Sequence, residues 1–133
     1  MTRLFTCSYR AFRPDMGQPV VCSLGLPKWR PEAAEWPRCH LLTPTWPMFN
    51  AVRETGDSEA FAAAYAARLE RFSVQRIART LEGIARAHQA DNLVLLCHEA
   101  DPERCHRTQF ADWWIQASGE EVAELIIPST TSP

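Results

Sequence analysis

The chain has 133 residues, of which 46% are hydrophobic and 23% are charged, and its formal net charge is −2. This size and composition are typical of one globular domain with a buried core, and they exclude a strongly basic protein that coats nucleic acid. No apolar run approaches the length of a membrane span or of the core of a signal peptide, so we expect no membrane partner and a cytoplasmic location. Five cysteines is an odd number for such a chain, which argues against a disulfide scaffold.

The charges are unevenly distributed along the chain. Residues 1–53 carry seven basic and three acidic side chains, whereas residues 54–133 carry seven basic and thirteen acidic ones. The N-terminal part is therefore expected to present a positive face to an anionic ligand. Thirteen of the fourteen basic residues are arginines, which suit bidentate phosphate contacts but which genomic base composition would also favour.

The N-terminal part is predicted to contain two strands and an irregular segment. Residues 4–8 and 19–24 are the two strands, because each is a short apolar run beside turn signals. Five prolines between residues 27 and 47 exclude a long regular element there, and residues 39–42 are predicted as a short strand within this segment. Long irregular segments are often functional, so this one is expected to line or cover a site. The side chains expected to pin it onto the body of the protein are Trp36, Trp46, Met48 and Phe49.

Two helices are predicted within residues 55–90. Asp57 or Ser58 is placed to cap the free N–H groups of the first helix, and Ser73 those of the second. Apolar residues recur three and four positions apart in both, which gives each helix one stripe that packs on a sheet. The predicted stripes contain Phe61, Tyr65, Leu69, Phe72, Ile77, Leu81, Ile84 and His88.

The C-terminal part is predicted to add a central strand, a helix and a last strand. Residues 93–96 form an all-apolar run, as expected of a strand that is covered on both faces. Asp101 and Pro102 are a helix-start signal. A helix is therefore predicted over residues 102–118, followed by a strand over residues 122–127.

This order of elements predicts an α/β fold. We expect a single compact three-layer domain over residues 1–128, with a mostly parallel sheet of about four or five strands and helices on both faces. Residues 129–133 are expected to form a polar, disordered tail.

Residue types that bind anions or carry out chemistry gather at or just after the central strand. Ligands of parallel sheets bind outside the carboxyl ends of the strands, and a helix N-terminus favours anions, so we expect a polar pocket here. Cys97, Glu99, Cys105 and His106 are the candidate catalytic residues, and Arg107 is a candidate ligand-binding residue.

Four residues from the N-terminal part are expected to contribute to the same pocket. Tyr9 and Arg10 follow the first strand, whose carboxyl end lies at the same edge of a parallel sheet. Gly25 allows a close approach of the backbone. Trp29 would stack on a ligand that carries a ring, unless it caps the core instead.

Five residues at or just after the central strand also resemble the motif of a known family: Cys97, Glu99, Cys105, His106 and Arg107. Their pattern, Cys-x-Glu followed by Cys-His-Arg after an apolar strand, resembles the signature of the DUF488 family, a domain of unknown function. Residues 23–29 and 61–69 resemble further segments of that family, and the likeness covers roughly residues 4–127. The resemblance implies a compact α/β domain with its pocket at these residues, and it implies no settled activity.

The favoured function is the binding or processing of a small nucleotide or nucleic-acid-derived anionic ligand. Arg107 and Arg10 would clamp the anion, and Glu99 would accept a hydrogen bond from a sugar hydroxyl or a base edge. Alternatively, Arg107 forms an internal ion pair with Glu99 or Asp101. Whether the protein is an enzyme stays open, nucleic acid itself remains a second class of partner, and no protein partner is predicted.

Three alternatives use the same residues differently. A thiol-dependent enzyme would use Cys97 or Cys105, with His106 as the base. A zinc site would combine these three side chains with another cysteine, but the spacing matches no zinc knuckle, so no metal site or cofactor is predicted. In the last alternative the residues hold the strand ends together, and the protein is a ligand-free interaction module.

Overall fold

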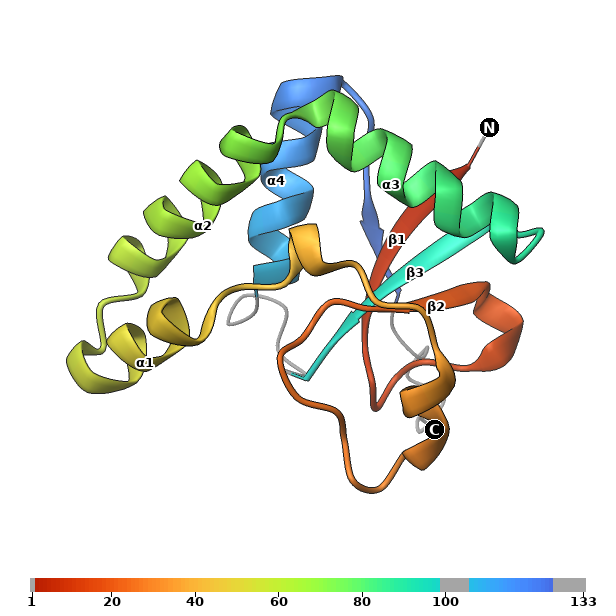
Figure 1. The fold of residues 1–133 in the computed structure, drawn as a ribbon, viewed down its shortest axis with the longest axis horizontal. Coiled ribbons are helices and arrows are strands. Elements are labelled where there is room, and N and C mark those ends of the chain that lie inside the picture. Colours follow the sequence, from red (N-terminus) through yellow and green to blue (C-terminus); the bar gives the residue numbers. More distant parts are fainter. Residues whose placement is uncertain (1, 99–105, 126–133) are drawn as a thin grey trace, which may run out of the picture.

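The computed structural model describes residues 2–98 and 106–125 of the chain. These residues form a four-stranded, all-parallel sheet in the order β2-β3-β1-β4, against which four α-helices pack (Figure 1). The predicted α/β class and parallel sheet are confirmed, and the predicted tail at residues 129–133 lies outside the described residues. The strands are β1 (Arg3–Ser8), β2 (Gln18–Val21), β3 (Asn92–Cys97) and β4 (Ala123–Glu124).

Strand β3 is the predicted central strand, and it pairs with β1 on one side and β2 on the other. Its apolar run over residues 93–96 is fully buried, as the pattern of a strand covered on both faces requires. Ser8 at the end of β1 lies opposite Cys97, and Val21 at the end of β2 lies opposite Leu96. The carboxyl ends of these three strands therefore meet at one edge, where parallel sheets bind ligands.

The helices include the two that the apolar stripes predict. Asp57 caps the first of these, since its Oδ1 accepts a hydrogen bond from the Ala60 N–H at 2.9 Å, and Ser73 caps the second through the Arg76 N–H at 3.3 Å. Ser73 has a positive φ of 76°, and it also ends the preceding helix. The four helices are α1 (Trp46–Thr55), α2 (Ser58–Phe72), α3 (Val74–Ala87) and α4 (His106–Ser118).

The two faces of the sheet are covered by different kinds of structure. On one face, Leu93 and Leu95 pack in a core with side chains of the α-helices, among them Leu69 and Phe110. On the other face, Val94 packs with residues of the chain that follows β1 and β2. The helical cover of that second face consists of short 3-10 helices. In the part of the chain that the structure describes, these are η1 (Pro14–Met16) and η2 (Pro31–Glu35), while a third, η3 (His40–Leu42), packs Leu42 into the core of the first face.

The prediction of a strand over residues 39–42 is wrong. Residues 40–42 form the helix η3 because the Cys39 carbonyl accepts hydrogen bonds from the Leu42 N–H at 3.2 Å and from the Thr43 Oγ1 at 2.9 Å. Strand β2 is also shorter than predicted and ends at Val21. The Val21 N–H donates a hydrogen bond to the Pro37 carbonyl at 2.8 Å.

Helix α1 was not predicted, and two side chains expected to pin the irregular segment onto the body do not do so. Thr45 caps α1 by accepting a hydrogen bond from the Met48 N–H at 3.3 Å. Trp46 and Phe49 remain 56% and 40% exposed. His88, predicted on a buried stripe, is also exposed because α3 ends at the residue before it. Figure 1 shows α1 and α2 projecting from one side of the sheet.

No helix within the described ranges, 2–98 and 106–125, is both long enough and apolar enough to cross a membrane.

Candidate functional site

A cavity of about 590 Å³ opens at the carboxyl ends of β2 and β3. This edge of the sheet is where the sequence places the candidate site, and the volume is that of a typical small-molecule pocket. One wall comes from the loop after β2, from α1 and from the start of α2. Its apolar side chains are Leu24, Pro44, Trp46, Phe49, Val52 and Phe61.

A second, more polar wall comes from the end of β3 and the first turns of α4. The strand places Cys97 on the face covered by helices, two positions after Leu95, because side chains alternate along a strand. Gln109 also belongs to this wall, and its Oε1 atom is shielded from solvent without a hydrogen-bond partner among the described residues. The polar or small lining residues are Ser23, Gly25, Ser58, Cys97, His98, His106 and Gln109.

Two histidines tie the loop after β2 to this wall. The Nε2 atom of His98 lies 2.7 Å from the Gly25 carbonyl oxygen, and that of His106 lies 2.7 Å from the Cys22 carbonyl oxygen. Because a carbonyl only accepts hydrogen bonds, Nε2 carries the proton in both rings. The loop carbonyls therefore fix the tautomer and the orientation of both imidazoles.

His106 is held in its neutral form. The pKa of its imidazole is lowered to about 4, chiefly because burial desolvates the charged form. The hydrogen bond to the Cys22 carbonyl acts against this shift, and electrostatic interactions with Arg107 and His98 add to it. The ring also packs edge-on against Tyr65, at 5.4 Å between centroids. At neutral pH the imidazole is therefore an uncharged hydrogen-bonding group in the cavity wall.

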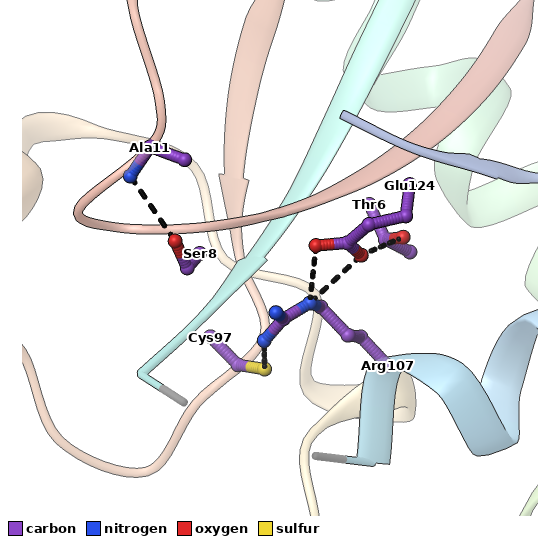
Figure 2. A network of polar contacts seen from close by, with 6 residues as sticks. All are labelled: Thr6, Ser8, Ala11, Cys97, Arg107 and Glu124. Carbon is purple, nitrogen blue, oxygen red and sulfur yellow. Dashed lines mark hydrogen bonds and ion pairs between the residues drawn. The ribbon is translucent and has the colours of Figure 1, made fainter. Parts of the chain in front are cut away.

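Arg107 is buried, and it takes part in a polar network at the back of the polar wall (Figure 2). Its Nε donates to both carboxylate oxygens of Glu124, at 2.9 and 3.1 Å, and its Nη1 donates to the Cys97 Sγ at 3.1 Å. The Thr6 hydroxyl donates to the same carboxylate at 2.6 Å. The network therefore joins α4 to β1, β3 and β4, and it pairs the guanidinium with a carboxylate.

The cysteines differ in their chemical state. Cys97 is disulfide-bonded, whereas Cys7, Cys22 and Cys39 are free and buried. Burial raises the pKa of each of these three thiols above its usual value, to about 11 for Cys7, so they are unreactive. Cys97 is therefore the described cysteine with a distinct chemistry, and the sequence pattern did not indicate its disulfide.

Two candidate catalytic residues cannot be placed. Glu99 and Cys105 lie outside the described residues, as does Asp101, which the sequence offered as an ion-pair partner of Arg107. Among the described residues, Arg107 forms an ion pair with Glu124 at 2.9 Å, and its predicted pairing with Glu99 or Asp101 stays a prediction.

Tyr9 supports the cavity from behind. Its side chain is buried, its hydroxyl lies 2.7 Å from the Ser23 Oγ, and its ring packs against His98 at 4.9 Å between centroids. Because Ser23 Oγ in turn donates to the Gly25 carbonyl at 2.7 Å, the Tyr9 hydroxyl donates to Ser23. Burial raises the pKa of Tyr9 to about 12, so its hydroxyl stays protonated.

Arg10 and Trp29 form a separate surface pair. The Arg10 guanidinium lies 6.0 Å from the centroid of the Trp29 ring, Arg10 is exposed, and Trp29 is 59% exposed. Neither residue lines the cavity. The structure thus brings Gly25, Cys97 and His106 together at the cavity, and it keeps this pair apart from them.

The site also contains residues that the sequence pattern missed. Trp46 and Phe49 of α1, Phe61 of α2 and Gln109 of α4 line the cavity without having been proposed as ligand-binding residues. One local signal for α1 was present, since Thr45 and Pro47 form the start of a helix. Nothing local indicates that the helix faces the end of β3.

A metal site finds no support among the described residues. Within residues 2–98 and 106–125, no group of three His, Cys, Asp or Glu side chains is arranged to hold a metal ion.

The fold and the cavity together define a class: a parallel α/β domain with a ligand-sized site at the carboxyl edge of its sheet. The chain belongs to the DUF488-N3a family, described as the active DUF488-N3 subclade, which it matches over residues 10–118. Comparison with curated proteins and with solved structures found no match. The resemblance seen in the Cys-x-Glu and Cys-His-Arg pattern is therefore confirmed at the level of the family.

Proposed function

We propose that this protein binds and processes a small nucleotide or nucleic-acid-derived ligand whose base occupies the cavity. The observation that carries the proposal is the composition of the cavity. The rings of Trp46, Phe49 and Phe61 line it together with histidine, serine and glutamine side chains. Small-molecule sites combine apolar walls with a few polar groups in this way.

A nucleobase matches both walls at once. Its flat faces pack favourably on aromatic rings, and its edges carry hydrogen-bond donors and acceptors. His98 and His106 have orientations fixed by the loop carbonyls, so they are pre-positioned against a ligand. The description of the family as an active subclade supports processing in addition to binding.

The test of this function is a binding panel with a blocked cavity as the control. The four common ribonucleosides and their monophosphates are titrated into the protein by isothermal titration calorimetry. A Cβ atom added at Gly25, which lines the cavity, would meet no atom within 4 Å, so a leucine at this position starts from open space and reduces the room in the cavity. Gly83 on α3 has the same freedom but is remote from the cavity, so Gly83→Leu is the matched variant.

We expect at least one ligand to bind the wild type and Gly83→Leu, and Gly25→Leu to lose at least about tenfold in affinity. Any ligand that binds is then incubated with the protein, and mass spectrometry of the mixture reports a product. The proposal fails if nothing in the panel binds, or if the blocked variant binds as well as the wild type.

A second function is favoured by one specific contact. The Arg107 guanidinium donates to the Cys97 sulfur at 3.1 Å, and a nearby cation stabilises a thiolate. After reduction of its disulfide, Cys97 would therefore be a candidate nucleophile at the cavity wall. In protein treated with a dithiol reductant, iodoacetamide should label Cys97 faster than the three buried thiols at neutral pH. Equal or slower labelling would remove this function.

A further inference from the structure

Resting on the proposed function, we infer that the cavity takes an uncharged base or nucleoside, stacked on Trp46, and that any phosphate of the ligand stays outside. This inference departs from the anion clamp that the arginine-rich sequence suggests. It follows from the charges around the cavity, from the exposure of the aromatic wall and from the chemistry of the polar wall.

The described lining of the cavity contains few charged groups. None of the described residues that line it is an arginine, lysine, aspartate or glutamate. His106 is neutral at physiological pH because burial lowers its pKa to about 4. The nearest buried cation, Arg107, donates from its Nε to the Glu124 carboxylate. Among the described residues, a phosphate inside the cavity would therefore meet no opposite charge that is not already paired, and a desolvated anion without a partner is strongly unfavourable.

The second step concerns the aromatic wall. Trp46 and Phe49 are 56% and 40% exposed, although large aromatic side chains are among those that gain most from burial. Their rings meet edge-on, at 6.2 Å between centroids and an interplanar angle of 87°. None of the ten residues of α1 is buried, so the packing of the fold does not account for these side chains. An aromatic ligand that stacks on them would bury the exposed rings.

The third step concerns the polar wall. Gln109 lines the cavity, its amide oxygen has no hydrogen-bond partner among the described residues, and rotation of the amide exchanges its donor and acceptor. Such a neutral amide suits the donor and acceptor groups on the edge of a base. The combination of polar groups and aromatic rings in the described lining therefore suits a heterocycle, whereas a phosphate needs cations.

The two exposed tryptophans allow a matched experiment. Trp29 is 59% exposed beside the cation of Arg10, and it does not line the cavity, so it is the residue on which an anion-guided ligand would stack. Trp46→Ala and Trp29→Ala are each titrated with nucleosides and with the corresponding 5′-monophosphates, at about 50 and about 300 mM sodium chloride. Inorganic phosphate is added as a competitor.

We expect each nucleoside and its monophosphate to bind the wild type within about threefold of each other at both salt concentrations. Trp46→Ala should lose about tenfold or more in affinity, as base stacking on an aromatic side chain predicts, whereas Trp29→Ala should change it by less than about twofold. Trp46→Phe should retain most of the affinity, and inorganic phosphate should not compete. Unchanged thermal unfolding of Trp46→Ala would show that the fold is intact.

The outcomes separate this inference from the proposed function. Monophosphates that bind at least about tenfold more tightly than nucleosides, with an affinity that falls with salt, would overturn the inference and restore an anion site. Loss of binding in Trp29→Ala but not in Trp46→Ala would overturn it as well. In the first case the protein would still bind a nucleotide, so the proposed function would stand. In the second case, unchanged binding by Gly25→Leu would overturn the proposed function as well, and weaker binding would leave it standing. Failure of every nucleoside and nucleotide to bind would overturn both.

Discussion

Cys97 lies between two regions of opposite character. Behind it, the guanidinium of Arg107 and the carboxylate of Glu124 form a closed, hydrogen-bonded ion pair that joins α4 to the sheet (Figure 2). In front of it, the described residues that line the cavity include no arginine, lysine, aspartate or glutamate. Two consecutive residues of one short motif therefore belong to different regions: His106 lines the cavity, and Arg107 forms the ion pair.

A motif residue of a type that often binds ligands, such as Arg107, can therefore serve the fold instead of the site. A buried ion pair joins elements of the fold in a fixed arrangement, and each charge loses its compensation if the partner is removed. The neutral region, in contrast, can accept a ligand without competing for that ion pair. We therefore expect substitutions behind Cys97 to affect stability and substitutions in front of it to affect binding.

The largest expected effect is that of Arg107→Ala. This change leaves the partly buried Glu124 carboxylate without its cation, so the free energy of unfolding should fall by about 3 kcal/mol, measured by urea denaturation. Arg13→Ala, which breaks the exposed pair with Asp15, is the control and should leave the unfolding transition unchanged. An Arg107→Ala protein of normal stability that no longer binds ligand would contradict the division between the two regions.

The next effect concerns the pH dependence that His106 contributes. In the unfolded chain its imidazole takes up a proton near pH 6.5, whereas in the folded protein it stays neutral down to about pH 4. Its stabilising contribution is therefore complete above pH 6.5 and is lost as the pH falls toward 4. Between pH 6.5 and pH 4 this proton uptake lowers the free energy of unfolding of the wild type by up to about 3 kcal/mol. We expect His106→Gln to lack that decrease when the free energy of unfolding is measured against pH.

A matched histidine sharpens that experiment. His98→Gln makes the same chemical change at an exposed ring that also bonds to a carbonyl of the loop after β2. We expect its pH profile to follow the wild type more closely than that of His106→Gln does. Identical profiles for the wild type and His106→Gln would show that the ring in front of Cys97 is not held neutral.

The smallest of these effects compares two buried tyrosines beside the cavity. Tyr65→Phe removes the hydroxyl that donates to the Leu42 carbonyl at 2.6 Å and should cost about 1–2 kcal/mol of stability, because that carbonyl loses a buried donor. Tyr9→Phe should cost less, because Ser23 keeps its bond to Gly25. Thermal unfolding of both variants measures the difference, and an equal loss would argue against this account of the hydrogen bonds.

Much of the fold could be predicted because its signals are local. The apolar run of β3, the caps Asp57 and Ser73 and the apolar stripes of α2 and α3 each lie within a few residues of sequence. Helix α1 was missed although Thr45 caps it, because the surrounding prolines suggest irregular structure. The strand predicted at residues 39–42 failed because short-range carbonyl bonds compete there with pairing to β2.

The candidate site was less predictable because its contacts join distant segments. The pattern after β3 located the correct edge of the sheet, and Gly25, Cys97 and His106 do line the cavity. No local signal pairs Arg107 with Glu124, which comes from another strand. Likewise, Trp29 and Trp46 are both exposed, and only the folded chain shows that Trp46 faces the end of β3.

Helix α1 has a further consequence for the local stability of the molecule. None of the ten residues of α1 is buried, and Met48 packs against the core only as a partly buried side chain, whereas β3 is enclosed on both faces. The amide hydrogens of α1 should therefore exchange with solvent through local opening, and those of β3 only through global unfolding. A ligand that packs on the rings of α1 would slow exchange in this helix first, so exchange protection reports occupancy of the cavity directly.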